Sequence, residues 1–266
     1  MSQTIYAYIS DGGVQEEISQ GAGRIAGHLG LDNLIMYYDA NNIQLSTKVD
    51  EVDSEDVAAK YRAWGWKVLS IDGCDSDAIR AALTEAKATV GQPTLIIGRT
   101  IMGRGAVAAD GSSFEDKVST HGQPLSAAGA DFAATVRHLG GDPEDPFRIF
   151  PDVQALYDAR LSELRQLAAA RREEEARWAV ENPDRAAKLE RWFGGAAPSI
   201  DWSQVEQKPN QATRAASATV LSVLATQVEN MIVASADLSN SDKTDGFLKK
   251  TRALSRGDFG GAFLQP

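Results

Sequence analysis

Residues 4–42 read "TIYAYISDGGVQEEISQGAGRIAGHLGLDNLIMYYDANN", and this stretch decides the fold class. It opens with β-branched and aromatic residues at Thr4–Ile9, which predict a strand that ends at an Asp-Gly-Gly turn. Helical spacing follows over Val14–Leu29, with small residues that indicate a closely packed helix. The continuous apolar run within Asn33–Asn42 predicts a second strand, buried on both faces. Strand, helix and strand in this order indicate a crossover unit of a parallel sheet.

The next residues repeat the alternation. A helix is expected in "SEDVAAKYRAWG", with Ser54 as its N-cap, and a strand in "WKVLSIDG". A further capped helix in "DSDAIRAALTEAKATVG" ends at Gly91, and a fourth strand spans Thr94–Ile101. The predicted fold class is therefore α/β, a parallel sheet with helices on both faces.

The pattern changes after Met102. A long irregular segment containing one histidine comes first, and loops of this length tend to be functional or disordered. A charged helical stretch at Leu156–Trp192 follows, and the patterns "ATRAASATVLSVLATQV" and "NMIVASADL" then predict a helix and a strand. We expect an α/β domain over 1–140, a helical linker region over 141–210 and the start of a second α/β domain over 211–266.

Composition excludes several classes of function. The formal net charge of −10 over 266 residues argues against a general binder of nucleic-acid phosphates. A single cysteine, Cys74, excludes an internal disulfide and any multi-cysteine metal site, and it fits a reducing compartment. No apolar run approaches the roughly 20 residues that a membrane span needs. We therefore expect a soluble cytoplasmic protein with no nucleic-acid or membrane partner.

Polar residues follow the first two predicted strands. Asp11 comes after the first strand and Asn41 after the second, and ligands of open parallel sheets collect at such carboxyl ends. Carboxylate and amide oxygens, with a nearby backbone carbonyl, suit Mg²⁺ or Ca²⁺. Gly12 would let a diphosphate approach the backbone at the start of a helix. Taken alone, the same residues also fit a simple turn that binds nothing.

A second motif points to a different cofactor. "GAGRIA" at Gly21–Ala26 matches the dinucleotide fingerprint of nicotinamide enzymes, with Asp39 as the acid for the ribose. The glycines of that fingerprint form the turn directly after a strand, whereas Gly21 falls inside the helical pattern. These small residues are better interpreted as close helix packing.

"ISDGGVQEEISQGAGRIAGHLGLDNLIMYYDANNIQL" closely resembles the thiamine-diphosphate motif of transketolases. The resemblance continues in order through "EDVAAKYRAWGWKVL", "PTLIIGRTIMGRG", "STHGQPL", "ATRAAS" and "ASADLSNS", and so covers nearly the whole chain. It implies the thiamine-diphosphate-binding fold and transfer of a two-carbon ketol unit from a ketose phosphate to an aldose phosphate, in the pentose phosphate pathway or the Calvin cycle. The related enzymes that make deoxyxylulose phosphate share the cofactor motif, but the "STHGQPL" and "ATR…SADLSNS" segments favour transketolase.

The resemblance implies a role for each residue of the first motif. Asp11 and the Asn41 side chain would bind Mg²⁺ (or Ca²⁺), with the Ile43 backbone carbonyl as a third ligand. Gly12 would touch the diphosphate. Ser10 stands where the family usually has the first glycine of Gly-Asp-Gly, which puts the backbone role of that position in doubt.

The later motifs imply substrate contacts. His121 in "THGQP" would contact cofactor and substrate and take part in catalysis. Arg214 in "ATR" and Ser241 in "DLSNS" would hold the sugar-phosphate end of the substrate. Asp237 in "SADL" would lie at the cofactor-facing subunit contact, and a homodimer is implied because active sites of this family form between subunits.

The resemblance begins inside the family's diphosphate-binding domain and stops early in its pyrimidine-binding domain. The upstream histidine and glycine-rich segments are not in this sequence, nor is the glutamate expected shortly after "FLQP". We therefore expect the central segment of a longer transketolase. The alternative is a non-catalytic remnant or interaction module that keeps the metal-diphosphate crevice.

Overall fold

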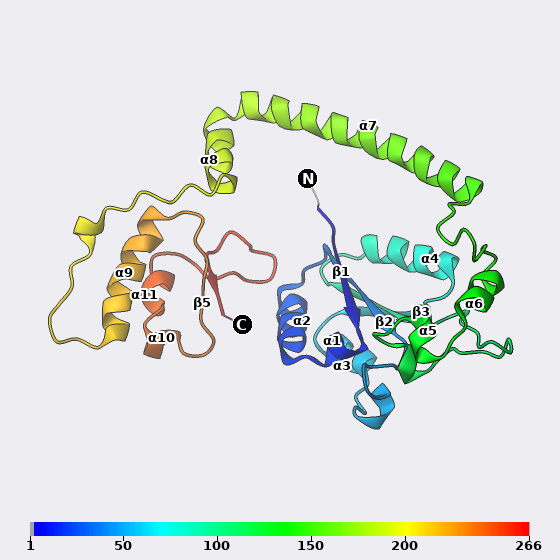
Figure 1. The fold of residues 1–266 in the computed structure, drawn as a ribbon. Coiled ribbons are helices and arrows are strands. Elements are labelled where there is room, and N and C mark those ends of the chain that lie inside the picture. The colour runs from blue at the N-terminus through cyan, green and yellow to red at the C-terminus, as the bar shows by residue number, and fades with distance from the viewer. Residues whose placement is uncertain (1–2, 266) are drawn as a thin grey trace. The chain divides into compact units, whose positions relative to one another are not determined.

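The computed structural model describes residues 3–265 (Figure 1). The chain divides into two compact units. The first comprises the described residues up to Pro146 together with Ser255–Phe259, and the second comprises Phe147–Leu254 with Gly260–Gln265. Within residues 3–265, none of the helices is both long enough and apolar enough to span a bilayer.

A four-stranded parallel sheet forms the centre of the first unit. Its strands are β1 (Ile5–Ser10), β2 (Leu34–Ala40), β3 (Lys67–Asp72) and β4 (Thr94–Arg99). They lie in the order β1-β2-β4-β3, and every neighbouring pair is parallel. The predicted parallel α/β sheet is confirmed, and each strand lies at the segment where the sequence predicts one.

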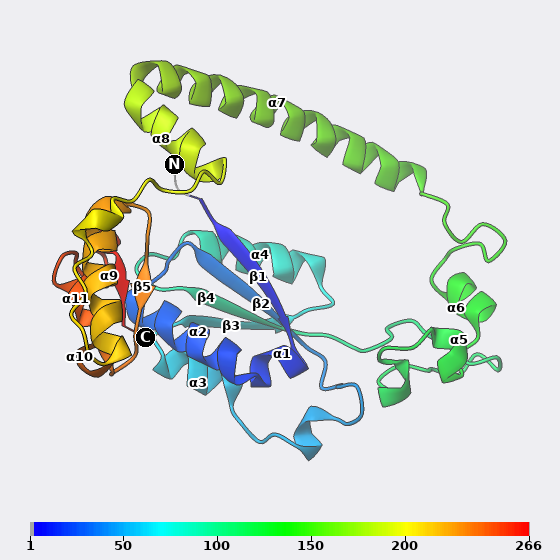
Figure 2. The same ribbon diagram turned by 60° about the vertical axis from the view of Figure 1, so that its left-hand side comes forward.

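Helices cover both faces of the sheet, as predicted (Figure 2). On one face lie α2 (Glu17–Leu29) and α3 (Val57–Ala63), and on the other lies α4 (Ser76–Lys87). Each face has its own apolar core. The first core contains Val14, Ala26, Tyr38, Tyr61, Trp66, Leu95 and Ile97, and the second contains Ile35, Ala82, Ala86 and Ile96.

The glycines of α2 allow close packing. A Cβ at Gly27 would overlap the Trp64 carbonyl oxygen, and one at Gly23 would lie 3.2 Å from Tyr61 Cε1. The Trp66 indole N–H donates to the Gly23 carbonyl oxygen over 2.7 Å. The packing interpretation of "GAGRIA" is therefore confirmed at Gly23, whereas a Cβ at Gly21 would have nothing within 4 Å. The strand-to-helix turn lies at Ser10, well before these glycines.

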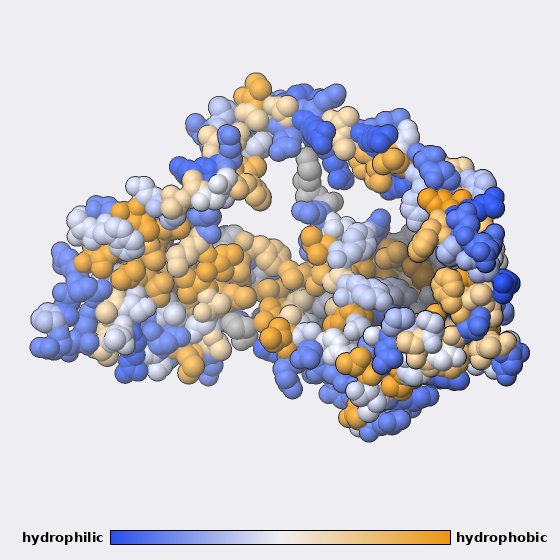
Figure 3. All heavy atoms as spheres, viewed as in Figure 1, coloured by the Kyte–Doolittle hydropathy of each residue, from blue (hydrophilic) through white to orange (hydrophobic). Residues whose placement is uncertain are grey.

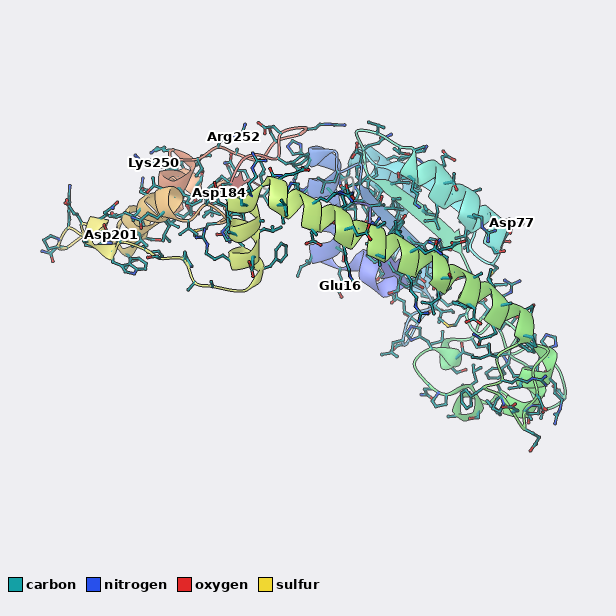
Figure 4. The ribbon with its side chains drawn as sticks, turned by 90° about the horizontal axis from the view of Figure 1, so that it is seen from above. Glu16, Asp77, Asp184, Asp201, Lys250 and Arg252 are labelled. Atoms are coloured by element: carbon teal, nitrogen blue, oxygen red, sulfur yellow. The ribbon has the colours of Figure 1, made fainter. Side chains whose placement is uncertain are left out.

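The first helix differs from the prediction. A short helix, α1 (Asp11–Gln15), begins directly after β1, and Glu16 separates it from α2. The reason is local, because the Ser10 hydroxyl accepts a hydrogen bond from the Gly13 N–H at 3.4 Å and caps α1. Glu16 has an extended backbone and an exposed side chain at this junction (Figure 4).

The predicted bounds of the next two helices also need correction. The N-cap of α3 is Asp56 instead of Ser54, because the Asp56 carboxylate accepts from the Ala59 N–H at 2.9 Å. The fourth helix, α4, ends at Lys87, before Gly91. The rest of the first unit is irregular, with short helices η1 (Val49–Glu51), η2 (Val118–Thr120), α5 (Leu125–Ala128) and α6 (Phe132–His138).

The second unit contains the charged helical stretch. Its helices and strands are α7 (Pro151–Glu181), α8 (Pro183–Phe193), η3 (Trp202–Gln204), α9 (Thr213–Gln227), β5 (Val233–Ala234), α10 (Ser239–Asp242), α11 (Asp245–Leu248) and β6 (Phe263–Leu264). No residue of α7 is buried, and hydrophilic and hydrophobic residues alternate along it (Figure 3). The strand predicted in "NMIVASADL" is reduced to the two residues of β5, which pair in parallel with β6.

Candidate functional site

The buried carboxylate of Asp11 is the centre of the candidate site. Asp11 is the first residue of α1, at the carboxyl end of β1, and only 3% of it is exposed. Its Oδ1 accepts a hydrogen bond of 2.6 Å from the Tyr38 hydroxyl. Its Oδ2 accepts one of 3.1 Å from the backbone N–H of Asn41. The structure therefore brings the carboxylate of Asp11 into contact with the backbone of Asn41, the second residue predicted as a ligand.

Burial destabilises the charged form of this carboxyl group. Desolvation raises the pKa of Asp11 above its ordinary value of 3.8, and the charge of Asp39 adds to that effect. The hydrogen bonds from Tyr38, Asn41 and Asn42 act in the opposite direction but do not cancel the burial effect. A bound cation would stabilise the charged form.

The loop after β2 holds the other predicted ligands. The Asn41 side-chain oxygen accepts from the Ile43 N–H at 3.0 Å, and Ile43 is buried. Asn42 has a left-handed backbone with φ +64°, and its side chain accepts from the Asp50 N–H at 3.2 Å and donates to the Asp50 carboxylate at 3.3 Å. Among residues 3–265, none of the backbone hydrogen bonds ends on the Ile43 carbonyl oxygen. In the described part of the chain, backbone donors thus leave that oxygen unoccupied.

The two glycines after Asp11 have different surroundings. A Cβ built on Gly12 would have nothing within 4 Å, so the space beside this residue is open. A Cβ on Gly13 would lie 2.9 Å from Ile9 Cγ1, so packing requires a glycine there. Gly12 thus leaves the start of α1 open to an approaching group, while Ser10 serves as the helix cap.

The segment that carries His121 approaches the loop after β2 through the next residue, Gly122. This glycine has φ +72°, and a Cβ on it would lie 3.0 Å from Leu45 Cδ1. The side chain of Lys48 reaches across to Asp116 at 3.4 Å. The Nδ1 atom of His121 is buried without a hydrogen-bond partner among the described residues. Buried polar atoms normally have a hydrogen-bond partner, so this atom has the capacity to bind a polar group of a ligand.

A cavity of about 380 Å³ lies beside the buried carboxylate of Asp11. Within the described part of the chain, no three His, Cys, Asp or Glu side chains converge as a metal cluster. A cation bound by the predicted ligands Asp11, Asn41 and Ile43 would depend on one carboxylate with amide and carbonyl oxygens. Of these three residues, only Asp11 lines the cavity. The cavity is lined by residues that include Asp11, Tyr38, Asn42, Asp56, Ser70 and Arg99.

The remaining predicted residues lie in the second unit. Arg214 is in the first turn of α9, Ser241 is in α10, and Asp237 precedes that helix; all three are exposed. The start of α9 and α10 lie at the same end of this unit (Figures 1 and 2). The Ser235 hydroxyl donates to Asp242 at 2.6 Å and closes the segment that carries Asp237 and Ser241. These three residues belong to the second unit and Asp11 to the first.

Sequence reasoning missed Tyr38. Burial, and then the hydrogen bond to Asp11, raise the pKa of its hydroxyl well above the ordinary value, so the hydroxyl keeps its proton. The parallel register pairs Tyr38 with Ile9, two residues before Asp11. Aligning the two predicted strands in this register would have pointed to Tyr38 as a neighbour of Asp11. The neighbouring Asp39, the acid of the dinucleotide alternative, accepts hydrogen bonds from the hydroxyls of Tyr8 and Thr100.

Comparison with known proteins gives a consistent result. The family model described as transketolase, thiamine diphosphate binding domain, matches residues 1–198. A transketolase of Scheffersomyces stipitis is 31% identical over 98% of this chain and 39% of its own length. Transketolase 2 of Xanthobacter flavus is 36% identical over 90% of this chain and 35% of its own length.

Solved structures agree with these matches. The structure of transketolase from Leishmania mexicana superposes with a TM-score of 0.86 and 29% identity, over 98% of this chain and 38% of that one. The chain thus spans about two fifths of the length of the relatives it matches. On its sequence, its parallel sheet and the polar residues at its strand ends, the chain belongs to the transketolase family.

Proposed function

We propose that the protein acts in a thiamine-diphosphate-dependent transketolase, which transfers a two-carbon ketol unit from a ketose phosphate to an aldose phosphate. The observation that carries the proposal is the contact between Asp11 and Asn41 at neighbouring strand ends, with Asn41 Nα and Asp11 Oδ2 3.1 Å apart. Asp11 begins α1 and Asn41 begins the loop after β2, both at the carboxyl end of the sheet, where ligands of parallel α/β folds collect.

The ligand set fits a hard divalent cation. The Asp11 carboxylate, the Asn41 side-chain oxygen and the Ile43 carbonyl would bind Mg²⁺ or Ca²⁺, both of which prefer oxygen ligands. The hydrogen bonds already made by Asp11 and Asn41 are compatible with this role, because each carboxylate or amide oxygen has two lone pairs. A cation would also offset the burial of the Asp11 charge.

The open space beside Gly12 supports a diphosphate group at the same place. The cation would neutralise part of the diphosphate charge. Thiamine diphosphate, when bound, supplies an electron sink for the carbon–carbon bond cleavage, and the protein supplies binding and orientation. His121 would donate a hydrogen bond or move a proton through its ring nitrogens, and its unpartnered Nδ1 supports such a contact.

Substrate contacts are assigned to the second unit. Arg214 would bind a substrate phosphate through two parallel hydrogen bonds, and Ser241 would add a third contact. Asp237 would lie at the cofactor-facing contact of a homodimer. We place the reaction in the cytoplasm, in the pentose phosphate pathway or the Calvin cycle, on the strength of family membership alone.

Two measurements test the proposal. Calorimetry of thiamine diphosphate binding should show tight binding with Mg²⁺, weak binding in EDTA, and weak binding in both conditions for Asp11→Ala. A coupled assay should detect ketol transfer from xylulose 5-phosphate to ribose 5-phosphate. Thiamine diphosphate affinity that is unchanged both by EDTA and by Asp11→Ala would contradict the site. Cofactor binding without ketol transfer would indicate a non-catalytic module instead.

A further inference from the structure

We propose that Tyr38 is a positioning residue that holds the Asp11 carboxylate ready for the cation. This inference rests on the proposed function, because it assigns a role toward the metal site described above. Its basis is the 2.6 Å hydrogen bond from the Tyr38 hydroxyl to Asp11 Oδ1.

The two oxygens of Asp11 are held from two different directions. Oδ1 is fixed by a side chain within β2, and Oδ2 is fixed by the backbone N–H of Asn41, just after β2 ends. Two donors on opposite oxygens prevent rotation of the carboxylate group. Each oxygen keeps a second lone pair, so the clamp leaves the carboxylate able to bind a cation.

Tyr38 is itself held by the sheet and the core. Its backbone is paired with Ile9 of β1 on one side and Ile97 of β4 on the other. Only 6% of it is exposed, and its ring packs in the core that contains Tyr61 and Leu95. The hydroxyl is thus presented by a rigid, buried strand, and sites supported in this way bind with less reordering than sites on loops.

Without the Tyr38 hydroxyl, Asp11 would keep one of its two clamping hydrogen bonds. The carboxylate could then turn about its terminal torsion, and the cation would have to order it on binding. Partners that orient metal ligands typically change metal affinity by about 10- to 100-fold when they are removed. The expected effect of Tyr38→Phe is therefore at least a tenfold weaker affinity for Mg²⁺.

Tyr61 offers a matched control in the same core. Its side chain is fully buried, and its hydroxyl has no hydrogen-bond partner among residues 3–265. Tyr61→Phe therefore removes an equally buried hydroxyl from the same cluster without touching Asp11. A general effect of removing a buried tyrosine hydroxyl would appear in both variants, whereas a positioning effect would appear only in Tyr38→Phe.

The experiment measures Mg²⁺ affinity by calorimetry at saturating thiamine diphosphate for wild type, Tyr38→Phe, Tyr61→Phe and Asp11→Ala. Tyr38→Phe should bind Mg²⁺ at least tenfold more weakly than wild type, and Tyr61→Phe should match wild type. Equal affinities for Tyr38→Phe and wild type would overturn the inference and leave the proposed function standing. Absence of Mg²⁺-dependent binding in wild type would instead overturn the proposed function.

A second readout uses the wild-type protein and does not depend on the folding of a variant. The ¹³Cζ resonance of Tyr38 reports its hydrogen bond, and it should shift when Mg²⁺ and thiamine diphosphate are added, while that of Tyr61 should not. If the Tyr38 resonance does not respond although the cation binds, Tyr38 has only a structural role and the inference is wrong.

Discussion

Replacing Gly27 with alanine tests how closely α2 packs on the chain that follows α3. The new Cβ would overlap the Trp64 carbonyl oxygen, and it would lie 2.9 Å from the Trp64 carbonyl carbon and 3.0 Å from Trp66 Cδ1. Two of these three neighbours are backbone atoms, which cannot rotate away. The helix must therefore move outward, by about 1.5–2 Å, to restore ordinary contacts of about 3.5–4.0 Å.

The expected loss of stability follows from three contributions. Overpacking of a well-packed core typically costs about 1–3 kcal/mol, and the backbone overlap at Gly27 places this site at the upper end. Outward movement of α2 also stretches the buried hydrogen bond from Trp66 to Gly23, which is worth about 1 kcal/mol. The higher helix propensity of alanine stabilises α2 by roughly 1 kcal/mol. The net loss should be about 3 kcal/mol.

Gly21 provides the control within the same helix. A Cβ at Gly21 would have nothing within 4 Å, so Gly21→Ala should gain roughly 1 kcal/mol from helix propensity alone. Urea unfolding followed by far-ultraviolet circular dichroism measures both variants against wild type. If Gly27→Ala were as stable as wild type, or changed by the same amount as Gly21→Ala, the close-packing account of α2 would be refuted.

Three further predictions concern single side chains. Tyr61→Phe should raise the free energy of unfolding by about 1 kcal/mol, because it removes a buried hydroxyl without a partner among the described residues. A lower free energy of unfolding in urea would contradict this. Asn42→Ala should be less stable than Asn42→Gly by about 1 kcal/mol, since both lose the contacts with Asp50 but only alanine is strained at φ +64°; equal unfolding midpoints would argue against the left-handed backbone. The Ser235 hydroxyl is the largest cause that holds the pKa of Asp242 below its ordinary value of 3.8, so this pairing stabilises the fold above that pH and is lost as the pH falls through the lowered pKa. Ser235→Ala should therefore raise the pKa of Asp242 in a carboxyl NMR titration, and an unchanged titration would show that the hydrogen bond does not form in solution.

The sheet was predictable because its signals are local. Short apolar runs such as Leu34–Ala40 favour strands buried between helices, and the turn residues that follow them fix where each strand ends. The position of Asp11 and Asn41 at one edge follows from the parallel arrangement. The packing role of Gly27 was also within reach, because small residues recur in the helical pattern of α2.

Other features depend on choices that sequence patterns leave open. Ser54 and Asp56 are both good N-caps, and only the three-dimensional path of the chain selects Asp56. The break at Glu16 depends on Ser10 capping a separate short helix. Tyr38 looks like any apolar strand residue until the register places it beside Asp11. Tertiary contacts, which no local window contains, decide the first and the third, whereas the cap at Ser10 is a local contact with Gly13.

The most direct measurement is a crystal structure of the protein with thiamine diphosphate and Mn²⁺, in which the anomalous signal of Mn²⁺ locates the cation. We expect one metal bound by the Asp11 carboxylate, the Asn41 side-chain oxygen and the Ile43 carbonyl, with metal–oxygen distances near the roughly 2.1 Å typical of Mg²⁺. A metal held by other residues, or a diphosphate bound away from Gly12, would contradict the account.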